Sequence, residues 1–584
     1  MKYPKLRTVE ASRTVIDAFG GYNHNLRIGD NEFFDMQNMC SDYYPVLSPR
    51  KKRGLHVTGT APEAMIYKNQ LFYIDSGIVY KENGFKDLVL NTNPNGRQMV
   101  SIGAYVVIFP ENRWFHTVTN KNGSCDAAWS SGTNAVVEFW PCKADGTTYV
   151  DGTITESDTA PKNPEDGAIW IDTSGDTPVM KQWVVNGDSG MWNTIISNYV
   201  KITATGIGKD FAQYDGIEIG GLTQENLTFL NGSDIVWSRD DDSIVVSGLL
   251  SSSSALLPEE ELTVKRETPV MDFVVECGNR LWGCRYGEND KGEFVNVIYG
   301  SKLGDFKNWH CFMGISTDSA EIHLGSDGPF TGAINYMGHP IFFKENVLHK
   351  VYVSSTGAHS VVDTACQGVQ RECDKSLSVV GDLLFYKSRA GIMTYDGSVP
   401  VAIPSVFGDK QYKTAAAGAC GKKYYISMED VSGGWNLFVY DTSKGLWHRE
   451  DDLQVKQFAT SEDRLYAISG NKILLLTGNT EDAEGSIRWF VQTGEIGIYT
   501  PDRKYLSRLN VRMMLAEDAE ASVMVRYDFE DDWRQLCTVT GTKMRSVDIP
   551  VRPMRCDHME LRIEGIGDAK VYSITKTIEE GSDL

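Results

Sequence analysis

Side chains that could do chemistry are dispersed along this chain and form no recognisable set. The run Asp240–Asp242 places three carboxylates side by side. A calcium loop spaces its oxygen ligands and needs a glycine, so we interpret this run as a solvated turn. The ten histidines are dispersed and form no H-x-H or H-E-x-x-H pattern, which disfavours a metal enzyme. We therefore predict no metal site, no cofactor and no catalytic residue.

Nucleophile and phosphate-binding patterns are also missing. The sequence has no G-x-S-x-G turn of a hydrolase and no G-x-x-x-x-G-K-[ST] loop. The Gly-Lys pair of GIGKDF, near Gly206, lacks the upstream spacing of a phosphate loop and reads as a hairpin turn. A sialidase-type glycosidase would need clustered arginines and a tyrosine nucleophile, and no such arrangement stands out. The chain is thus predicted not to be an enzyme, with a cellular enzyme or scaffold propeller kept as an alternative.

Three tryptophans offer a different kind of chemistry. Trp170, Trp183 and Trp192 alternate with turn residues in a short, polar, strand-rich stretch. Exposed aromatic faces stack on sugar rings, so the stretch is a candidate glycan platform. Alternating strands in a two-layer module also place tryptophans in the core. Both interpretations stay open at the level of sequence.

The strongest structural signal is a repeated pair of strands. It begins at Ile341 (IFFKENVLHKVYV), Leu383, Tyr424 and Leu465, at intervals of 42, 41 and 41 residues. A period near forty in an all-β stretch is typical of propeller blades, each a four-stranded sheet that cannot bury its faces alone. A propeller is a rigid platform and by itself names no chemistry.

Composition limits the classes of function. The chain has 584 residues and a net charge of −21, which disfavours nucleic-acid wrapping because that requires lysines and arginines against the phosphates. Its eleven cysteines include no C-x-x-C pair and are expected to be buried free thiols of a protein made in a reducing cytoplasm. No segment has the ~18 apolar residues of a membrane helix, so we expect no membrane association.

The predicted fold class is all-β, with a β-propeller, an extended N-terminal arm, an inserted small β module and a C-terminal β-sandwich. Helical periodicity of any length is absent, and the last ninety residues or so alternate apolar and polar positions as sandwich strands do. The insertion is expected to split one blade. The predicted boundaries are 1–60 for the arm, 61–120 for the first blade or blades, 121–262 for the inserted module, 263–485 for the remaining blades and 486–584 for the sandwich.

The arm carries the most basic spot of the chain, Arg50–Arg53. One interpretation is a solvated turn. The other is a contact to an acidic neighbouring subunit, since opposite charges steer and orient association.

Several phrases, taken in order, resemble the tail-nozzle or tail-hub β-propeller proteins of phage virions. The arm FGGYN…DNEFFDMQNM…YYPVLSPRKKRG is similar to their N-terminus, YGSKLGDFKNW to a blade segment, and GIMTYDG to a hairpin. The C-terminal segments RYDFEDDW and PVRPMRCDHMELRIEGIGDAKVYSI resemble their sandwich. The matching residues are Gly20, Gly21, Asn23, Glu32, Asp35, Asn38, Pro49, Arg50, Gly54, Gly304, Trp309, Tyr395, Asp396 and Gly397.

This resemblance implies a structural protein of a bacteriophage tail, made in the host bacterial cytoplasm and located in the virion. Such proteins form a ring, commonly of six copies, around the DNA-ejection channel. Their partners would be adaptor, fibre or tail-tip proteins, and the passing genome would not be bound sequence-specifically. The alternative is a receptor-binding or tail-peripheral protein that holds host-surface glycans through the tryptophan-rich module.

Overall fold

The computed structural model describes residues 11–580, except 83–85, 92–95, 151, 188, 290, 462, 478–483 and 529. The chain is built almost entirely of strands; among the described residues the only helical turns are η1 (Thr228–Leu230) and η2 (Asp374–Ser376). The predicted all-β fold class is therefore confirmed. Residues 1–10 of the predicted arm lie outside the described part.

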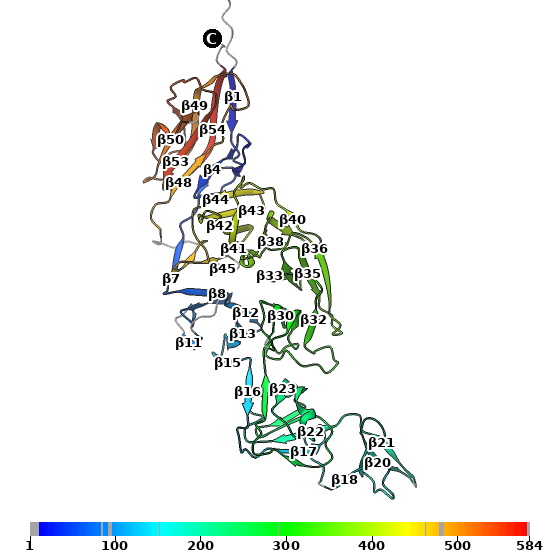
Figure 1. The fold of residues 1–584 in the computed structure, drawn as a ribbon. Helices are drawn as coiled ribbons and strands as arrows, with labels where there is room; N and C mark the ends of the chain where they lie inside the picture. The colour runs from blue at the N-terminus through cyan, green and yellow to red at the C-terminus, as the bar shows by residue number, and fades with distance from the viewer. Residues whose placement is uncertain are drawn as a thin grey trace, which may run out of the picture.

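Seven antiparallel four-stranded sheets form the middle of the molecule, and we call them blades 1 to 7 (Figure 1). Blades 1 to 3 are β8 (Pro62–Lys68), β9 (Gln70–Asp75), β10 (Ile78–Lys81), β11 (Lys86–Val89); β12 (Gln98–Ile102), β13 (Tyr105–Phe109), β14 (Arg113–His116), β15 (Asn122–Ser124); and β29 (Phe273–Cys277), β30 (Arg280–Glu288), β31 (Phe294–Gly300), β32 (Ala320–His323).

Blades 4 to 7 contain the predicted repeat, each copy of which falls on the second strand of its blade. They are β33 (Phe330–Tyr336), β34 (His339–Lys344), β35 (Val347–Tyr352), β36 (Ser360–Ala365); β37 (Ser378–Val380), β38 (Leu383–Ser388), β39 (Gly391–Tyr395), β40 (Val401–Ala402); β41 (Tyr412–Cys420), β42 (Lys423–Asp430), β43 (Trp435–Asp441), β44 (Leu446–Arg449); and β45 (Gln457–Thr460), β46 (Leu465–Ser469), β47 (Lys472–Leu475), β7 (Gly54–Thr58).

The blades pack face to face in a closed ring, which is the arrangement of a seven-bladed propeller. A buried apolar cluster lies between neighbouring blades, including the last and the first, where Tyr466 and Ile473 of blade 7 pack with Met65 and Tyr73 of blade 1. The Gln457 side chain also donates a hydrogen bond to the Met65 carbonyl, at 2.9 Å. No blade is split, because the insertion falls between blades 2 and 3; the expectation of a split blade was wrong.

Blade 7 is completed by a strand from the other end of the chain. β7, near the N-terminus, pairs antiparallel with β47 as the outer strand of that sheet. The ring is therefore closed by strand pairing between segments about 400 residues apart, in addition to side-chain packing.

The sandwich is closed in the same way. Its strands alternate buried and exposed positions as predicted; in β49, Leu509, Val511 and Met513 are buried. The N-terminal arm supplies an edge strand to each of the two sheets. It also forms two short pairs, β2 (Gly21–Tyr22) with β3 (Glu32–Phe33) and β5 (Met39–Cys40) with β6 (Ser48–Pro49). The sheets are β1 (Ala11–Ile16), β54 (Ala569–Glu580), β49 (Lys504–Leu515), β52 (Arg545–Ile549); and β4 (Asp35–Gln37), β48 (Arg488–Gln492), β53 (Met559–Ile566), β50 (Glu520–Tyr527), β51 (Arg534–Thr540).

The inserted module has two parts. A two-sheet body encloses its own apolar core, and a smaller distal sheet extends from it. The body consists of β16 (Ala127–Ser130), β28 (Thr263–Arg266), β23 (Gly216–Gly220), β24 (Gly232–Ile235); and β25 (Ser238–Asp240), β26 (Ser243–Ser247), β22 (Tyr199–Thr203), β17 (Glu138–Cys142), β27 (Ser254–Ala255). The distal sheet consists of β18 (Ile154–Ser157), β19 (Ile169–Asp172), β20 (Val179–Asn186) and β21 (Ser189–Thr194).

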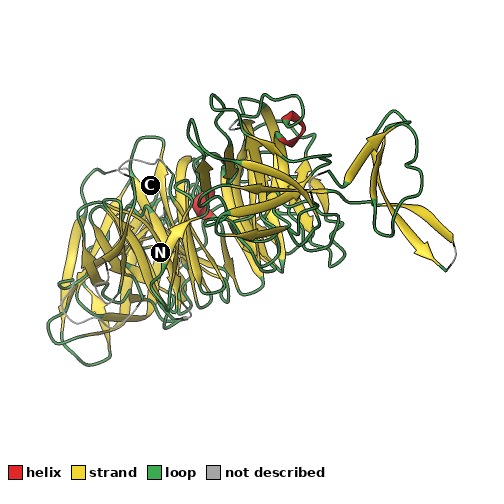
Figure 2. Cartoon of the chain, turned by 90° about the horizontal axis from the view of Figure 1, so that it is seen from below, coloured by secondary structure: helices red, strands yellow, loops and turns green. Residues whose placement is uncertain are grey.

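The three parts are arranged in a line. The sandwich lies beside β44 at one edge of the ring of blades, and the module hangs from the opposite edge (Figure 1). The distal sheet projects farthest from the ring, as the view from below also shows (Figure 2). In the part of the chain that is described, no helix is long and apolar enough to cross a membrane.

Candidate functional site

The N-terminal motif residues meet where the sandwich, blade 6 and blade 7 come together, and we call this place the arginine joint. Asn38, between β4 and β5, has a left-handed backbone with φ of 56°. Its amide N–H donates to the Glu450 carbonyl at 2.5 Å and its side-chain N–H to the Arg488 carbonyl at 2.8 Å, while its Oδ1 accepts from Arg50 Nε at 2.8 Å. One buried asparagine thus links the arm, a blade and the sandwich.

Two buried arginines complete the arginine joint. Arg50 makes a two-pronged contact with Glu484 at 2.8 and 3.0 Å, and Arg53 bonds Glu450 at 2.7 Å and Asp451 at 2.6 and 3.0 Å. Burial would raise the pKa of Asp451, but the adjacent Arg53 guanidinium holds it below its ordinary value. Two-pronged arginine–carboxylate pairs fix geometry as well as charge.

The basic cluster therefore does two different things within one chain. Arg50 and Arg53 point inward to acids of the same chain, whereas Lys51 and Lys52 are exposed. Neither interpretation of the cluster, a solvated turn or a contact to an acidic neighbouring subunit, describes the two arginines, which are buried against acids of their own chain. Gly54, directly after them, begins the closing strand β7.

The remaining arm residues form turns of the arm or, in the case of Gly21, its contact with blade 6. Gly21 has φ of +80°, and a Cβ there would lie 2.3 Å from the Trp447 carbonyl oxygen of β44; only glycine allows both. Asn23 Oδ1 accepts from the Asn25 side chain at 2.8 Å and Glu32 accepts from an amide in the loop it closes. Gly20 lies directly before β2, where its N–H donates to the Asn31 carbonyl at 2.7 Å, and Pro49 lies in β6.

The blade segment that contains Gly304 and Trp309 receives the inserted module. Gly304 is a left-handed turn residue and Trp309 is buried in the core between blades 2 and 3. Between them, the fully buried Asn308 accepts from the Gly216 N–H at 3.1 Å and donates to the Tyr214 carbonyl at 2.7 Å. This asparagine was not singled out from the sequence, although it lies inside the quoted segment.

Replacing Asn308 by alanine should loosen the module from the ring of blades. The variant leaves the buried Gly216 amide without its acceptor, which costs about 1–3 kcal/mol. Hydrogen exchange of β23 should accelerate by one to two orders of magnitude, with blades 5 to 7 unchanged. Leu303→Ala, an exposed change in the same turn, is the control, and equal exchange in both variants would contradict the role of Asn308.

The residues of the GIMTYDG segment, which ends at Gly397, form a structural turn. Tyr395 is buried and its hydroxyl donates to the Gly397 carbonyl at 3.1 Å. The Asp396 carboxylate accepts from the amide and hydroxyl of Ser398 at 2.9 and 2.5 Å. These contacts satisfy the turn locally.

The three tryptophans of the distal sheet lie together, with the ring centroids of Trp170 and Trp192 5.3 Å apart, but they differ in exposure. Trp170 is only 6% exposed, and its indole N–H donates to the Ser157 carbonyl at 3.0 Å, so it is a core residue. Trp183 and Trp192 are cross-strand partners, partly exposed, with ring centroids 5.3 Å apart. The Trp183 ring lies over Gly190, where an added Cβ would come within 2.3 Å of it.

No known family and no curated protein matches this chain. Among solved structures, it is similar to an exo-β-1,3-galactanase from Phanerochaete chrysosporium with galactose, at 10% identity over 77% of this chain and 100% of that one, with a TM-score of 0.19. A variant of the same enzyme with β-1,3-galactotriose matches at 10% identity, over 73% and 99%, with a TM-score of 0.18. A puromycin hydrolase mutant complexed with PGG matches at 9% identity, over 68% and 58%, with a TM-score of 0.21.

These matches correct the prediction that the chain is not an enzyme, because the structures it matches are those of enzymes. The physical weakness of that prediction was its reliance on local motifs. A propeller gathers side chains from separate blades, so a catalytic set need leave no motif in the sequence. At these TM-scores the matches say nothing of which activity, if any, this chain has.

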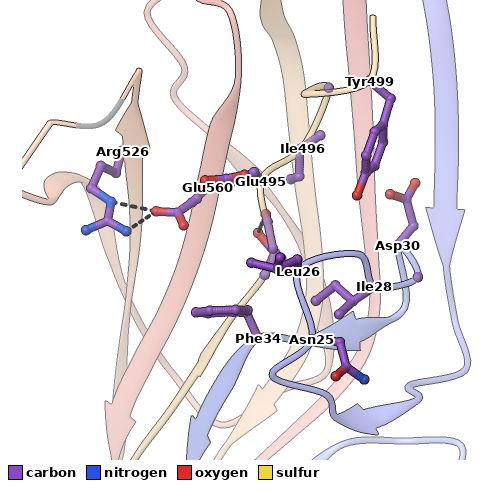
Figure 3. Close-up of a pocket in the computed structure, with 14 residues that line it drawn as sticks. Asn25, Leu26, Ile28, Asp30, Phe34, Glu495, Ile496, Tyr499, Arg526 and Glu560 are labelled. Carbon is purple, nitrogen blue, oxygen red and sulfur yellow. Dashed lines mark hydrogen bonds and ion pairs between the residues drawn. The ribbon is translucent and has the colours of Figure 1, made fainter. Parts of the chain in front are cut away.

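A cavity of about 300 Å³ lies in the sandwich, between the loop of residues 25–34 and the segment 493–499. Figure 3 shows Arg526 and Glu560 on one side of it, joined at 2.5 Å, and Tyr499 with Asp30 on the other. Asp30 is paired outside the cavity, with Lys576. None of the residues singled out from the sequence lines this space, and its charged groups are mostly paired, so it offers a small pocket without an assembled reactive set.

Acid should weaken the junction between sandwich and blade 6 through His448. This side chain in β44 is 3% exposed; burial lowers its pKa to about 4, assisted by Lys423 and opposed by Asp441 and Asp42. Between pH 6.5 and 4 the unfolded chain binds the extra proton, so stability falls as the pH falls through this window. The loss should total about 3 kcal/mol, at about 1.4 kcal/mol per pH unit.

Urea unfolding at several pH values between 7.5 and 4.5 measures this dependence. His448→Gln should flatten the curve below pH 6.5, whereas His323→Gln, at an exposed histidine, should leave it unchanged. Identical curves for wild type and His448→Gln would show that other groups carry the dependence.

Proposed function

We propose that this chain is a structural component of a bacteriophage tail that assembles as a ring around the DNA-ejection channel and contacts adaptor and fibre proteins. The supporting observation is the arginine joint. Gly21, Asn38, Arg50 and Gly54, dispersed along the arm, all serve one junction of arm, blades and sandwich. That these residues of the resemblance lie together in one three-dimensional unit of this chain supports the proposal.

Shape and charge support the same role. A rigid ring of blades with a sandwich at one edge and a module at the other presents separate surfaces for two sets of neighbours (Figure 1). Copies related by rotation would contact one another through different faces and close a ring. The net charge of −21 would let DNA phosphates pass without adhesion.

Native mass spectrometry and negative-stain imaging of the purified protein test this proposal over a range of concentrations and salt. We expect a closed oligomer, of six copies by the family resemblance, and no retardation of double-stranded DNA in a gel at low salt. A strict monomer under all conditions, or tight DNA binding, would argue against the proposed role.

A second candidate function is glycan binding by the distal sheet. One observation favours it: Trp183 of β20 lies over Gly190 and is partly exposed. It belongs to the distal sheet, the part of the molecule that projects farthest from the ring of blades (Figure 1). An indole face in this position can stack on a sugar ring.

A glycan array with the wild type and two variants tests this second function. Trp183→Ala should abolish any signal, whereas Val184→Ala, on the opposite face of the same strand, should retain it. An array without signal, or a signal that survives Trp183→Ala, would remove the distal sheet as a glycan site.

A further inference from the structure

Three side chains of blades 3 and 4 form a connected nucleophile–base–acid set. Ser326 lies in the loop between β32 and β33, His349 in β35 and Asp363 opposite it in β36. Ser326 Oγ is 3.0 Å from His349 Nε2, and His349 Nδ1 is 2.6 Å from Asp363 Oδ1. We propose that Ser326, His349 and Asp363 are the catalytic residues of an acyl-transfer site that cleaves small carboxylic esters.

The environment of His349 favours the neutral imidazole, which is the protonation state that acyl transfer needs. The side chain is 0% exposed, and burial lowers its pKa against the opposing effect of Asp363. A neutral imidazole that donates from Nδ1 to Asp363 presents a bare Nε2 to the Ser326 hydroxyl. This is the orientation in which an imidazole accepts the proton of a serine nucleophile.

Ser326 is held in place from two other strands. Its carbonyl accepts from Lys344 Nζ at 2.8 Å and from Asn296 Nδ2 at 2.7 Å. Lys344 Nζ also bonds Asn296 Oδ1 at 2.9 Å, which links β34 to β31. The backbone of the nucleophile is therefore held by the buried Lys344 and the partly buried Asn296, although it lies in a loop.

The serine is accessible while its base is covered. Ser326 is partly exposed in the sequence Gly325–Gly328, so a substrate would approach from the side of the loop. Within the described residues, the amides of Asp327 and Gly328 donate no hydrogen bond to the protein. They are the nearest donors along the chain for the oxygen that becomes negative during acyl transfer.

Cleavage of the ester consumes one water molecule and needs no other co-reactant. Oγ forms a bond to the ester carbonyl carbon as its proton moves to His349 Nε2. The carbon–oxygen bond of the leaving group then breaks, and that alkoxide takes the proton from Nε2. A water molecule repeats the two steps on the acyl-serine, which releases the carboxylic acid and restores Ser326.

A fluorophosphonate probe, which phosphonylates activated serines, tests the assignment on the full chain. We expect one adduct, mapped to Ser326 by peptide mass spectrometry, and slow hydrolysis of p-nitrophenyl acetate. Both should disappear in Ser326→Ala. Ser398→Ala, at an exposed serine bonded to a carboxylate and to no histidine, should label like the wild type.

His349 is buried, so His349→Gln could fail to fold, and Asp363→Asn provides the second variant. Asp363 is 51% exposed, and its replacement should preserve the melting temperature while slowing labelling at least tenfold. Absence of labelling in the wild type, or equal labelling of Asp363→Asn, would overturn the proposal. The three residues would then serve only as a hydrogen-bonded connection between blades 3 and 4.

Discussion

Replacing Arg53 by alanine is expected to lower the free energy of unfolding by about 3–5 kcal/mol, the cost of breaking a buried ion pair from one side. The guanidinium is 4% exposed and is the closest cation to both Glu450 and Asp451. Without the Arg53 guanidinium, only Arg50 balances the negative charge of the two carboxylates. Its guanidinium nitrogens are 3.7 Å from the Glu450 carboxylate and 3.5 Å from that of Asp451. Urea unfolding followed by tryptophan fluorescence measures the loss.

The neighbouring Lys52 gives a matched control, since Lys52→Ala removes the same formal charge from an exposed side chain. Its effect should stay within about 0.5 kcal/mol. Hydrogen exchange should also accelerate in β7 of the Arg53 variant, because the arginine directly precedes this strand. Equal stability of the two variants would mean that the arginine joint is held by other contacts.

Replacing Gly21 by alanine is expected to cost about 2–5 kcal/mol. The left-handed backbone disfavours any side chain by about 1–2 kcal/mol, and a Cβ placed 2.3 Å from the Trp447 carbonyl oxygen adds overpacking of about 1–3 kcal/mol. Since neither the β2 backbone nor the β44 carbonyl can move freely, the arm should separate from blade 6.

Gly381 provides the control for backbone strain alone. It has φ of +61° and nothing within 4 Å of an added Cβ. Gly381→Ala should therefore carry only the cost of the left-handed backbone and not that of overpacking. Differential scanning fluorimetry should place its melting temperature between those of the wild type and Gly21→Ala. The reverse order would show that contact with Trp447 is not decisive.

The blades were predictable because their signal is local. Each copy of the period places an apolar strand, a turn and a second strand within about fifteen residues, and the copies at Ile341 and Leu465 fall on β34 and β46. Alternation in the C-terminal strands is local too, which is why the sandwich could be recognised.

The partners of the arm were not predictable by the same means. β1 and β4 are short, and their partners β54 and β48 lie more than 450 residues away. A pairing over such a distance leaves no periodicity, so the sequence predicted only an extended arm and not the strands with which it pairs. Likewise, nothing near Arg53 indicates that its acids are Glu450 and Asp451.

The reactive groups show the same limit. Ser326, His349 and Asp363 lie in three separate elements, and only the register of β35 with β36 brings the histidine and the aspartate together. The sequence did identify the tryptophans of the distal sheet, but it could not tell that Trp170 is buried whereas Trp183 is partly exposed. Faces of a sheet are assigned only once the neighbouring layers are known.

The closing strand β7 also has a consequence for biosynthesis. At the usual rate of translation, the ribosome reaches β47 roughly 20–80 s after β7 has been made, and β1 and β4 wait longer for the last sandwich strands. During that time the N-terminal strands have no partner, and their free edges are open to wrong pairing. A chain whose synthesis stops before β47 can complete neither the ring of blades nor the sandwich, and one that stops between β47 and β54 cannot complete the sandwich. Correct folding of the N-terminal strands therefore depends on translation through β54.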